Sequence, residues 1–467
     1  MMTKQFFKNK RITVFGLGLN GGGVSTVRFL AKYGVKEIIV TDIKQRSELT
    51  SSIEAIKGIK NITYVLGQHR PEDFTRVDMV IINPGIAWTN EYVRLALKKN
   101  ILVEMDASLF FQLCDRPIIG ITGTKGKTTT ATLVADILQT AGHHVVRAGI
   151  GQIPVLDVLE NLKKTSVVVF ELSSWRLSSL EHIRKSPHIG IFTNVFPDHL
   201  NYYKNMDGYV RDKKNIFVFQ TKKDWLIVNQ DNETVRETAN NAQARILKFS
   251  EHTAPDREGI WVEDNAIQCL IGDTRHTIMT LDEIIVLGKH NLSNILAALG
   301  GALAYGVDVK ILRKVVMNFS GVAHRLEYVR TKDGIDYYND TAATMPQATI
   351  MALQSFTKPI VLIAGGNNKG LDFSELSASI VKYSKDVVFF KGEATEKIIK
   401  AMRQYLPEAR KEITFEIVES MGDALRSASN KAQAGDVVLL SPGAASFGLF
   451  KNEFDRGDQF CAAVKKL

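Results

Sequence analysis

Short runs of apolar residues recur along the chain, and several of them end in a turn that is followed by a segment with helical spacing. The runs at residues 11–15 (RITVF), 37–42 (EIIVTD), 116–122 (RPIIGIT) and 165–171 (TSVVVFE) are rich in Ile and Val. Such runs are typical of strands in a parallel sheet that is covered on both faces. Their alternation with helical segments predicts an α/β protein.

The length of the chain, 467 residues, is too great for one ordinary hydrophobic core. At about 100–200 residues per domain, we expect three domains. Hydrophobic residues make up 45% and charged residues 23% of the sequence, as in an ordinary soluble enzyme. No signal-peptide core follows the basic start, and no apolar run approaches the roughly 18 residues of a membrane span. We therefore expect a cytoplasmic protein without a membrane partner.

The cysteines and the charge exclude further classes. Cys114, Cys269 and Cys461 are far apart and odd in number, which argues against a disulfide framework and a zinc site. The formal net charge is +9, but Lys and Arg are scattered, without a recognition module for nucleic acid. We expect no nucleic-acid partner. The surplus charge indicates either a bland basic surface or binding of several anionic small molecules.

The first glycine-rich turn follows the first apolar run. Gly16, Gly18 and Gly21 fit the G-x-G-x-x-G pattern, and Asp42 ends the next strand. This arrangement allows a close approach to a pyrophosphate at a helix N-terminus, with the acid near a ribose or base. It is consistent with an NAD(P) site, with another nucleotide-diphosphate site, or with glycines that serve packing alone. The turn at residues 82–87 (INPGIA) is expected at the same sheet edge.

A second loop, GTKGKT at residues 123–128, lies between an expected strand and an expected helix that ends at Gly142. Backbone N–H groups and the helix dipole would hold ATP phosphates, Lys127 would neutralise phosphate oxygens, and the Thr128 hydroxyl would bind Mg²⁺. The standard P-loop requires a glycine where Ile121 stands. The loop is therefore a phosphate-binding loop of a variant form.

Acidic and imidazole groups follow two later strands. Glu171 ends one apolar run, and Asn194, Asp198 and His199 follow another. In a P-loop protein such strand ends lie beside the phosphates, so Glu171 and His199 are candidate metal ligands, and the carboxylate suits Mg²⁺.

Eight motifs in this order resemble the Mur ligases of peptidoglycan synthesis, and among them the members that add glutamate. They are GTKGKTTT, ELSSWRL, TNVFPDHLNYY, GKHNLSNILAAL, GVAHRLEYV, YNDTAAT, GGNNKGLDF and LLSPGAASFGLFKNEFDRGDQF, and they span essentially the whole chain. The resemblance implies a Rossmann-like N-terminal domain for the UDP substrate (residues 1–106), a central P-loop ATPase domain (107–321) and a C-terminal Rossmann-like domain (322–467) that closes over the site.

The resemblance also implies the reaction. ATP would phosphorylate the L-alanine carboxylate of UDP-N-acetylmuramoyl-L-alanine, and the amine of glutamate would attack the acyl phosphate, with Mg²⁺ as cofactor. A monomer is expected. Lys127, His199 and Lys213 would be catalytic, with Lys213 carbamylated and Lys214 as the alternative if the alignment is displaced by one residue. The metal ligands would be Thr128, Glu171, His199 and Lys213.

The remaining site residues are also assigned by resemblance. ATP would contact Gly123, Thr124, Lys125, Gly126, Lys127, Thr128, Thr129, Asn291, Arg325 and Asp340. The two other substrates would contact Gly18, Leu19, Asn20, Asp42, Thr344, Ser446 and Phe447.

Four positions depart from the usual glutamate ligase. Lys125 replaces Asn, Ala342 replaces the lysine that meets D-glutamate, Glu453 replaces an aromatic residue, and Ile150 replaces an Asn that contacts the nucleotide substrate. Loss of a charge-assisted partner costs about 1.5–3 kcal/mol unless another cation replaces it. We therefore expect a rebuilt pocket that favours L-glutamate, with an ordinary D-glutamate ligase as the alternative.

Three further classes remain open. A folylpolyglutamate synthase would not need the first domain with Gly16, Gly18 and Asp42. A nicotinamide dehydrogenase would explain that domain but not Lys127, Glu171 and His199. A non-catalytic ATP-binding regulator would keep the phosphate loop and lose the metal and acyl-transfer residues.

Overall fold

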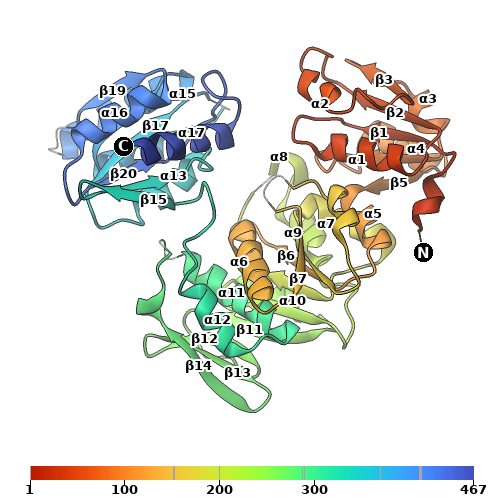
Figure 1. Ribbon diagram of the computed structural model, residues 1–467, viewed down its shortest axis with the longest axis horizontal. Helices are drawn as coiled ribbons and strands as arrows, with labels where there is room; N and C mark the ends of the chain where they lie inside the picture. Colours follow the sequence, from red (N-terminus) through yellow and green to blue (C-terminus); the bar gives the residue numbers. More distant parts are fainter. Residues whose placement is uncertain are drawn as a thin grey trace. The chain divides into compact units, whose positions relative to one another are not determined.

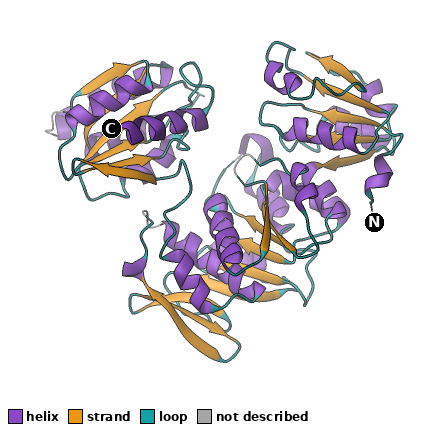
Figure 2. Cartoon of the chain, in the orientation of Figure 1, coloured by secondary structure: helices purple, strands orange, loops and turns teal. Residues whose placement is uncertain are grey.

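The computed structural model describes residues 2–150, 153–198, 200–286, 288, 290–368, 370–409 and 413–467. These residues form three sheets, each flanked by helices (Figures 1 and 2). The chain divides into two compact units, residues 1–284 with 293–317 and residues 285–292 with 318–467. The predicted α/β class is confirmed, whereas the three domain boundaries stay a prediction. Every helix among the described residues is too short or too polar to cross a membrane.

The first sheet is parallel, with the strand order β3-β2-β1-β4-β5. Because the order reverses between β1 and β4, the loops after these two strands flank a topological switch point, where open α/β sheets bind ligands. The strands are β1 (Arg11–Phe15), β2 (Glu37–Asp42), β3 (Ile62–Leu66), β4 (Met79–Ile82) and β5 (Leu102–Met105). The helices are η1 (Lys4–Phe7), α1 (Gly22–Lys32), α2 (Thr50–Glu54), α3 (Glu72–Thr75), α4 (Glu91–Lys98) and α5 (Asp106–Leu113).

The second sheet has the order β14-β13-β12-β11-β10-β9-β6-β8-β7, parallel from β7 to β12 and antiparallel at β12-β13-β14. Its strands are β6 (Ile118–Thr122), β7 (His144–Ala148), β8 (Ser166–Glu171), β9 (Ile189–Phe192), β10 (Trp225–Asn229), β11 (Arg245–Ser250), β12 (Gly259–Glu263), β13 (Ala266–Ile271) and β14 (Thr274–Thr280). Since β8 and β9 both pair with β6, the segments that follow these three strands meet at one edge.

The helices of this region are α6 (Lys127–Thr140), η2 (Asp157–Asn161), α7 (Ser174–Ile183), α8 (Leu200–Tyr203), α9 (Met206–Lys214), α10 (Glu233–Ala239), η3 (Leu281–Glu283), α11 (His290–Tyr305) and α12 (Val309–Val316). Most residues of helix α6 are buried. The helix ends two residues before Gly142. The predicted strand–loop–helix at the phosphate loop is therefore confirmed.

The third sheet, in the second unit, has the order β15-β16-β20-β17-β18-β19 and is parallel except at β15-β16. Alternate residues of β17 face opposite sides: Leu362 packs with α13 to α15, and Ile363 packs with α16 and α17. The strands are β15 (Glu327–Lys332), β16 (Ile335–Asn339), β17 (Ile360–Gly365), β18 (Ser384–Phe390), β19 (Phe415–Val418) and β20 (Val437–Leu440). The helices are α13 (Pro346–Leu353), α14 (Ser374–Tyr383), α15 (Glu393–Ala409), α16 (Met421–Lys431) and α17 (Glu453–Lys466).

Candidate active site

The phosphate loop connects β6 to α6 and is tightly enclosed at its two glycines. Gly126 precedes α6 in the left-handed conformation, with φ 82°, and no side chain caps this helix start in the described structure. A Cβ atom at Gly126 would lie 1.9 Å from Asn294 Oδ1, and one at Gly123 would lie 1.9 Å from Thr193 Oγ1. Both positions therefore require glycine. The N–H groups of the first turn of α6 stay available to an anion, as in other phosphate sites at helix N-termini.

Two lysines converge on this loop from different helices. Lys127 Nζ, in the first turn of α6, donates to the carbonyl oxygens of Gly123 (3.0 Å) and Thr124 (3.1 Å). Lys213 Nζ, on α9, donates to the same Gly123 oxygen at 2.9 Å. Sequence reasoning named both lysines, and the structure brings them together across 86 residues of chain. Lys214, the next residue, is half-buried.

The environment of Lys213 disfavours its charged form. Its side chain is buried, with 1% relative exposure, and its ammonium nitrogen lies 4.6 Å from the centre of the Tyr209 ring. Burial, followed by the neighbouring Lys127 ammonium, holds the pKa of Lys213 well below its usual range, against the opposing effects of Asp198 and Asp212. A neutral amine is nucleophilic, so Lys213 is chemically suited to carbamylation.

Residues after β9 hold the outer part of the loop. Asn194 Oδ1 accepts from the Lys125 backbone N–H at 2.8 Å, and Asp198 lies 3.8 Å from Lys125 Nζ. The Thr124 hydroxyl accepts from the Phe196 N–H at 3.0 Å and lies 3.2 Å from the Tyr209 hydroxyl. Tyr209 was missed by sequence reasoning, although its position one helical turn before Lys213 placed it on the same face of α9.

Glu171 ends β8, the strand beside β6. Its Oε2 atom is buried and has no hydrogen-bond partner in the described structure. A buried carboxylate oxygen without a donor fits a hard cation such as Mg²⁺.

Of the other predicted metal ligands, Thr128 is half-buried in the first turn of α6, and His199 lies outside the described residues. No group of three or more potential ligands from His, Cys, Asp and Glu gathers among the residues described.

Two further residues that the resemblance assigns to ATP lie on helices. Asn291 is buried in the first turn of α11, and Thr129 is buried in α6. Asn294, one turn further along α11, was missed by sequence reasoning, although it is one of the polar residues in the quoted GKHNLSN motif. Its backbone carbonyl accepts from Thr130 Oγ1 at 3.5 Å, which joins α11 to α6.

The glycine-rich loop of the first sheet is braced by Asp42. One carboxylate oxygen accepts from the Gly18 N–H and the other from the Lys44 N–H, each at 3.0 Å. Leu19 and Asn20 are exposed at the tip of the loop. A small cavity lies against it, lined by Val14, Gly16, Gly22, Gly23, Thr26, Ile81, Ile82, Asn83, Pro84 and Asp106.

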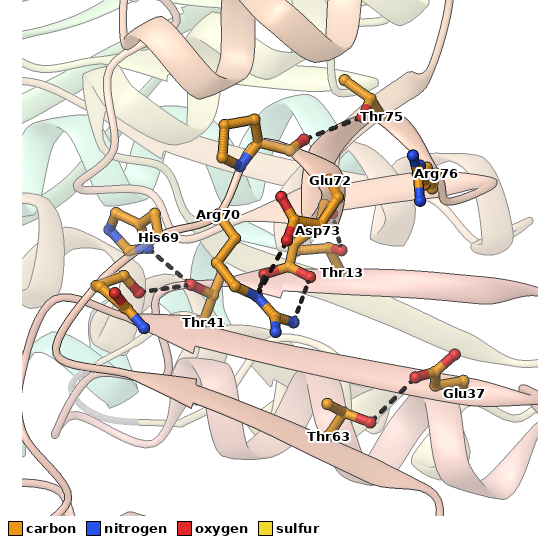
Figure 3. Close-up of polar contacts among 12 residues, drawn as sticks. Thr13, Glu37, Thr41, Thr63, His69, Arg70, Glu72, Asp73, Thr75 and Arg76 are labelled. Atoms are coloured by element: carbon orange, nitrogen blue, oxygen red, sulfur yellow. Dashed lines mark hydrogen bonds and ion pairs between the residues drawn. The ribbon is translucent and has the colours of Figure 1, made fainter.

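The strand edge beside Asp42 is fixed by the segment after β3 (Figure 3). The His69 ring is directed toward Thr41, with 2.7 Å between Nδ1 and Oγ1, and it packs edge-on against Phe15. Burial lowers the pKa of His69. Arg70 donates twice to Asp73, at 2.8 and 2.9 Å. These contacts are structural supports of the loop edge.

In the second unit, Asp340 follows β16 and is buried. Its carboxylate accepts from the Ser441 hydroxyl at 2.7 Å and from the Leu326 N–H at 3.2 Å. Burial raises the pKa of Asp340 to about 7, partly offset by these hydrogen bonds and by Arg325. Arg325 itself is exposed, as a phosphate-binding side chain would need to be.

The loops around the predicted glutamate pocket are tied together by Arg456, which sequence reasoning missed. Its guanidinium is fully buried and donates to Thr341 Oγ1 and Thr341 O, each at 3.0 Å, and to Ala444 O at 3.5 Å. Burial lowers its pKa to about 10. The sequence did indicate a special role for Arg456, because an arginine stands on the apolar face of the last helix.

The predicted pocket residues differ in exposure. Ser446 Oγ is buried without a partner in the described part of the chain, whereas Phe447 is 56% exposed and Thr344 is half-buried.

Comparison with known proteins covers the whole chain. Residues 10–104 match the Mur ligase MurD-like N-terminal domain, residues 121–302 the Mur ligase middle domain, and residues 324–443 the Mur ligase glutamate ligase domain. The UDP-N-acetylmuramoylalanine–D-glutamate ligase of Roseiflexus sp. (strain RS-1) is 40% identical over 98% of this chain and 99% of its own. The enzyme of the same name from Clostridioides difficile (strain 630) is 36% identical, with the same coverage.

Solved structures share the fold. The UDP-N-acetylmuramate–alanine ligase MurC of Thermotoga maritima superposes with a TM-score of 0.60 at 17% identity, covering 98% of this chain and 99% of its own. A pseudomurein peptide ligase type C from Methanothermus fervidus has a TM-score of 0.54 at 17% identity, covering 98% of this chain and 100% of its own. The predicted three-domain architecture is thereby confirmed.

Proposed function

The chain belongs to the Mur ligase family, and from this premise we propose that it joins glutamate to UDP-N-acetylmuramoyl-L-alanine. Members of the family are ATP-dependent, ADP-forming amide ligases that use Mg²⁺, so the enzyme class and cofactors predicted from the sequence hold. Family membership over all three domains excludes a nicotinamide dehydrogenase. The specific substrates are proposed because the relatives that match the full chain carry them in their names.

The observation that carries the proposal is the convergence of Lys127 and Lys213 on Gly123, together with the buried, unpartnered Oε2 atom of Glu171 on the neighbouring strand. Lys127 and the N–H groups at the start of α6 would hold the ATP phosphates. Glu171, Thr128 and a carbamylated Lys213 would supply oxygen ligands for Mg²⁺, which when bound stabilises negative charge on the phosphates. Lys127 would stay cationic at the phosphate oxygens, where negative charge develops.

The reaction these residues serve is carboxylate activation. An oxygen of the L-alanine carboxylate attacks the γ-phosphorus of ATP, and the bond to ADP breaks. The neutral amine of glutamate then attacks the acyl carbon. The C–O bond to phosphate breaks, the amine loses its proton, and the amide is formed together with inorganic phosphate. The chain's own contribution is positioning and charge stabilisation.

For the isomer, we propose D-glutamate. The named relatives with full-length similarity add the D isomer, and the comparisons do not support the L-glutamate preference that was predicted from the replaced pocket residues. Ala342 is half-buried next to Thr341, which Arg456 holds. A buried guanidinium beside this loop supplies positive potential even where the usual lysine is absent.

The test is a ligation assay with UDP-N-acetylmuramoyl-L-alanine, ATP and Mg²⁺, run separately with each glutamate isomer. ADP release and the mass of the nucleotide product are measured. The proposal predicts amide product with D-glutamate and a kcat/KM at least about tenfold lower with L-glutamate, a difference of about 1.4 kcal/mol. Faster ligation of L-glutamate would restore the sequence-based preference. Absence of glutamate-dependent ADP release with both isomers would refute the substrate assignment.

A further inference from the structure

Helix α7 carries an arginine that reaches from the second sheet to the first. Arg176 donates to Asp106 Oδ2 through Nη2 at 3.0 Å and through Nε at 3.3 Å, and Nε lies 3.4 Å from Asp106 Oδ1. The Arg176 side chain is 20% exposed and that of Asp106 is 7% exposed. This largely buried ion pair lies within one compact unit of the chain. In the same unit, Phe110 of α5 packs against Phe170 of β8, with ring centres 5.2 Å apart.

The same helix also contacts the segment after β4, which contributes residues to the small cavity beside the glycine-rich loop, here called the glycine-loop cavity. Trp88, in the segment after β4, donates from its indole N–H to Ser178 Oγ at 2.8 Å. Its ring stacks on His182 with 4.1 Å between centroids. Asn83 and Pro84 of this segment line the cavity together with Asp106. Helix α7 therefore contacts both Asp106 and the segment after β4.

The charge of Asp106 raises a physical problem for the proposed ligand. The cavity adjoins the glycine-rich loop, where the UDP group of the substrate is proposed to bind, and a diphosphate is repelled by a buried carboxylate. Arg176 offsets this charge, because its guanidinium is held against the carboxylate by two donors. An arginine in this place is thus required by the carboxylate rather than by packing alone.

We propose that Arg176 is a positioning residue for the nucleotide substrate. It acts through Asp106: the ion pair neutralises the wall of the glycine-loop cavity, so that a nucleoside diphosphate can bind at the glycine-rich loop. It also ties that cavity to α7, the helix that follows Glu171. The ligand class is a uridine or similar nucleoside diphosphate, and in this respect the inference rests on the proposed function.

The experiment measures binding of UDP to the full-length protein by calorimetry in the absence of ATP. Breaking a buried ion pair on one side leaves an uncompensated charge, so Arg176→Gln is expected to raise the Kd of UDP about tenfold or more. Arg176→Gln combined with Asp106→Asn removes both charges and is expected to return the Kd to within about threefold of wild type. In the ligation assay, Arg176→Gln is expected to raise the KM of the nucleotide substrate while the KM of ATP stays unchanged.

Two variants provide controls. Arg176→Lys keeps the charge without the fork of donors and is expected to have an affinity between those of wild type and Arg176→Gln. Arg11, the first residue of β1, forms an ion pair with Glu37 at 2.7 Å. Arg11→Gln breaks this pair and is expected to leave UDP binding unchanged. Circular dichroism verifies folding of every variant.

The outcomes separate the two proposals. Wild-type UDP affinity in Arg176→Gln, or a folded double variant as weak as the single one, would overturn the inference. Ligation by wild type without measurable UDP binding would overturn the inference and leave the proposed function standing. UDP binding that follows the predicted order, in a protein that does not ligate glutamate, would support the inference and refute the proposed substrates.

Discussion

Lys127 and Lys213 donate hydrogen bonds to one atom, the carbonyl oxygen of Gly123, at 3.0 and 2.9 Å. Burial, followed by the neighbouring Lys127 ammonium, holds the pKa of Lys213 well below its usual range. We therefore infer different roles for two residues of the same type: Lys127 binds phosphate, and the environment of Lys213 favours the neutral amine, which can react with CO₂.

Carbamylation of Lys213 is the first prediction. The amine attacks CO₂ and loses a proton, which gives an anionic oxygen ligand. Lys213→Ala is expected to lower kcat by about a hundredfold or more, as does loss of an essential charged group in a site. A carbamate signal is expected by NMR after incubation with ¹³C-bicarbonate, and it should be absent from the variant. The matched control is Lys214→Ala, which should stay active. If Lys214→Ala were inactive and Lys213→Ala active, the assignment would be contradicted.

Glu171→Gln tests the oxygen without a partner. Removing the charge of a metal ligand is expected to raise the Mg²⁺ concentration needed for half-maximal activity by about tenfold or more, with partial recovery at high Mg²⁺. Glu160→Gln, in the η2 segment away from the phosphate loop, serves as the control. An unchanged Mg²⁺ requirement in Glu171→Gln would remove Glu171 from the metal site.

The pH dependence of stability tests Asp340, whose pKa is raised to about 7 by burial. The stability that its protonated form contributes is fully present below the unfolded pKa of about 4 and is lost as the pH rises through about 7. In Asp340→Asn, the difference in unfolding free energy between pH 5 and pH 8 should therefore shrink, by roughly 1.4 kcal/mol for each pH unit between pH 5 and the folded pKa of about 7. Chemical denaturation at both pH values measures it.

Asp333→Asn, at an exposed turn of the same unit, should leave that difference unchanged. An equally steep loss of stability in Asp340→Asn would show that Asp340 is ionised in the folded protein near neutral pH.

Lys127→Ala should abolish ATP turnover while the fold is kept, because the lost ammonium lies at a half-buried loop rather than in the core. ADP release and circular dichroism are measured together, with the exposed Lys57→Ala as the control. Full ligase activity in a correctly folded Lys127→Ala would show that ATP binds elsewhere.

Much of the fold could be predicted from local pattern. The strands that end at Asp42 and Glu171, and the loop between β6 and α6, follow from apolar runs that are ended by glycine or polar residues. The positions of Gly123 and Gly126 also carried a signal, since a phosphate loop leaves no room for a Cβ atom.

Long-range contacts could not be predicted in this way. Lys213 lies 90 residues from Gly123, and nothing in the spacing around "RDKKN" distinguishes Lys213 from Lys214. The orientation of α9 in the fold distinguishes them, because it buries Lys213 and leaves Lys214 half-buried. The pairing of Arg176 with Asp106 is likewise set by how two sheets share one core, which no local pattern encodes.

The central claim, ligation through an activated carboxylate, is tested most directly by following oxygen. UDP-N-acetylmuramoyl-L-alanine is labelled with ¹⁸O in the alanine carboxylate and incubated with the enzyme, ATP, Mg²⁺ and D-glutamate, and the phosphate released is analysed by mass spectrometry. Because the carboxylate oxygen that attacks the γ-phosphorus leaves with the phosphate, one ¹⁸O atom per amide formed should appear in inorganic phosphate. Amide product accompanied by unlabelled phosphate would contradict the account.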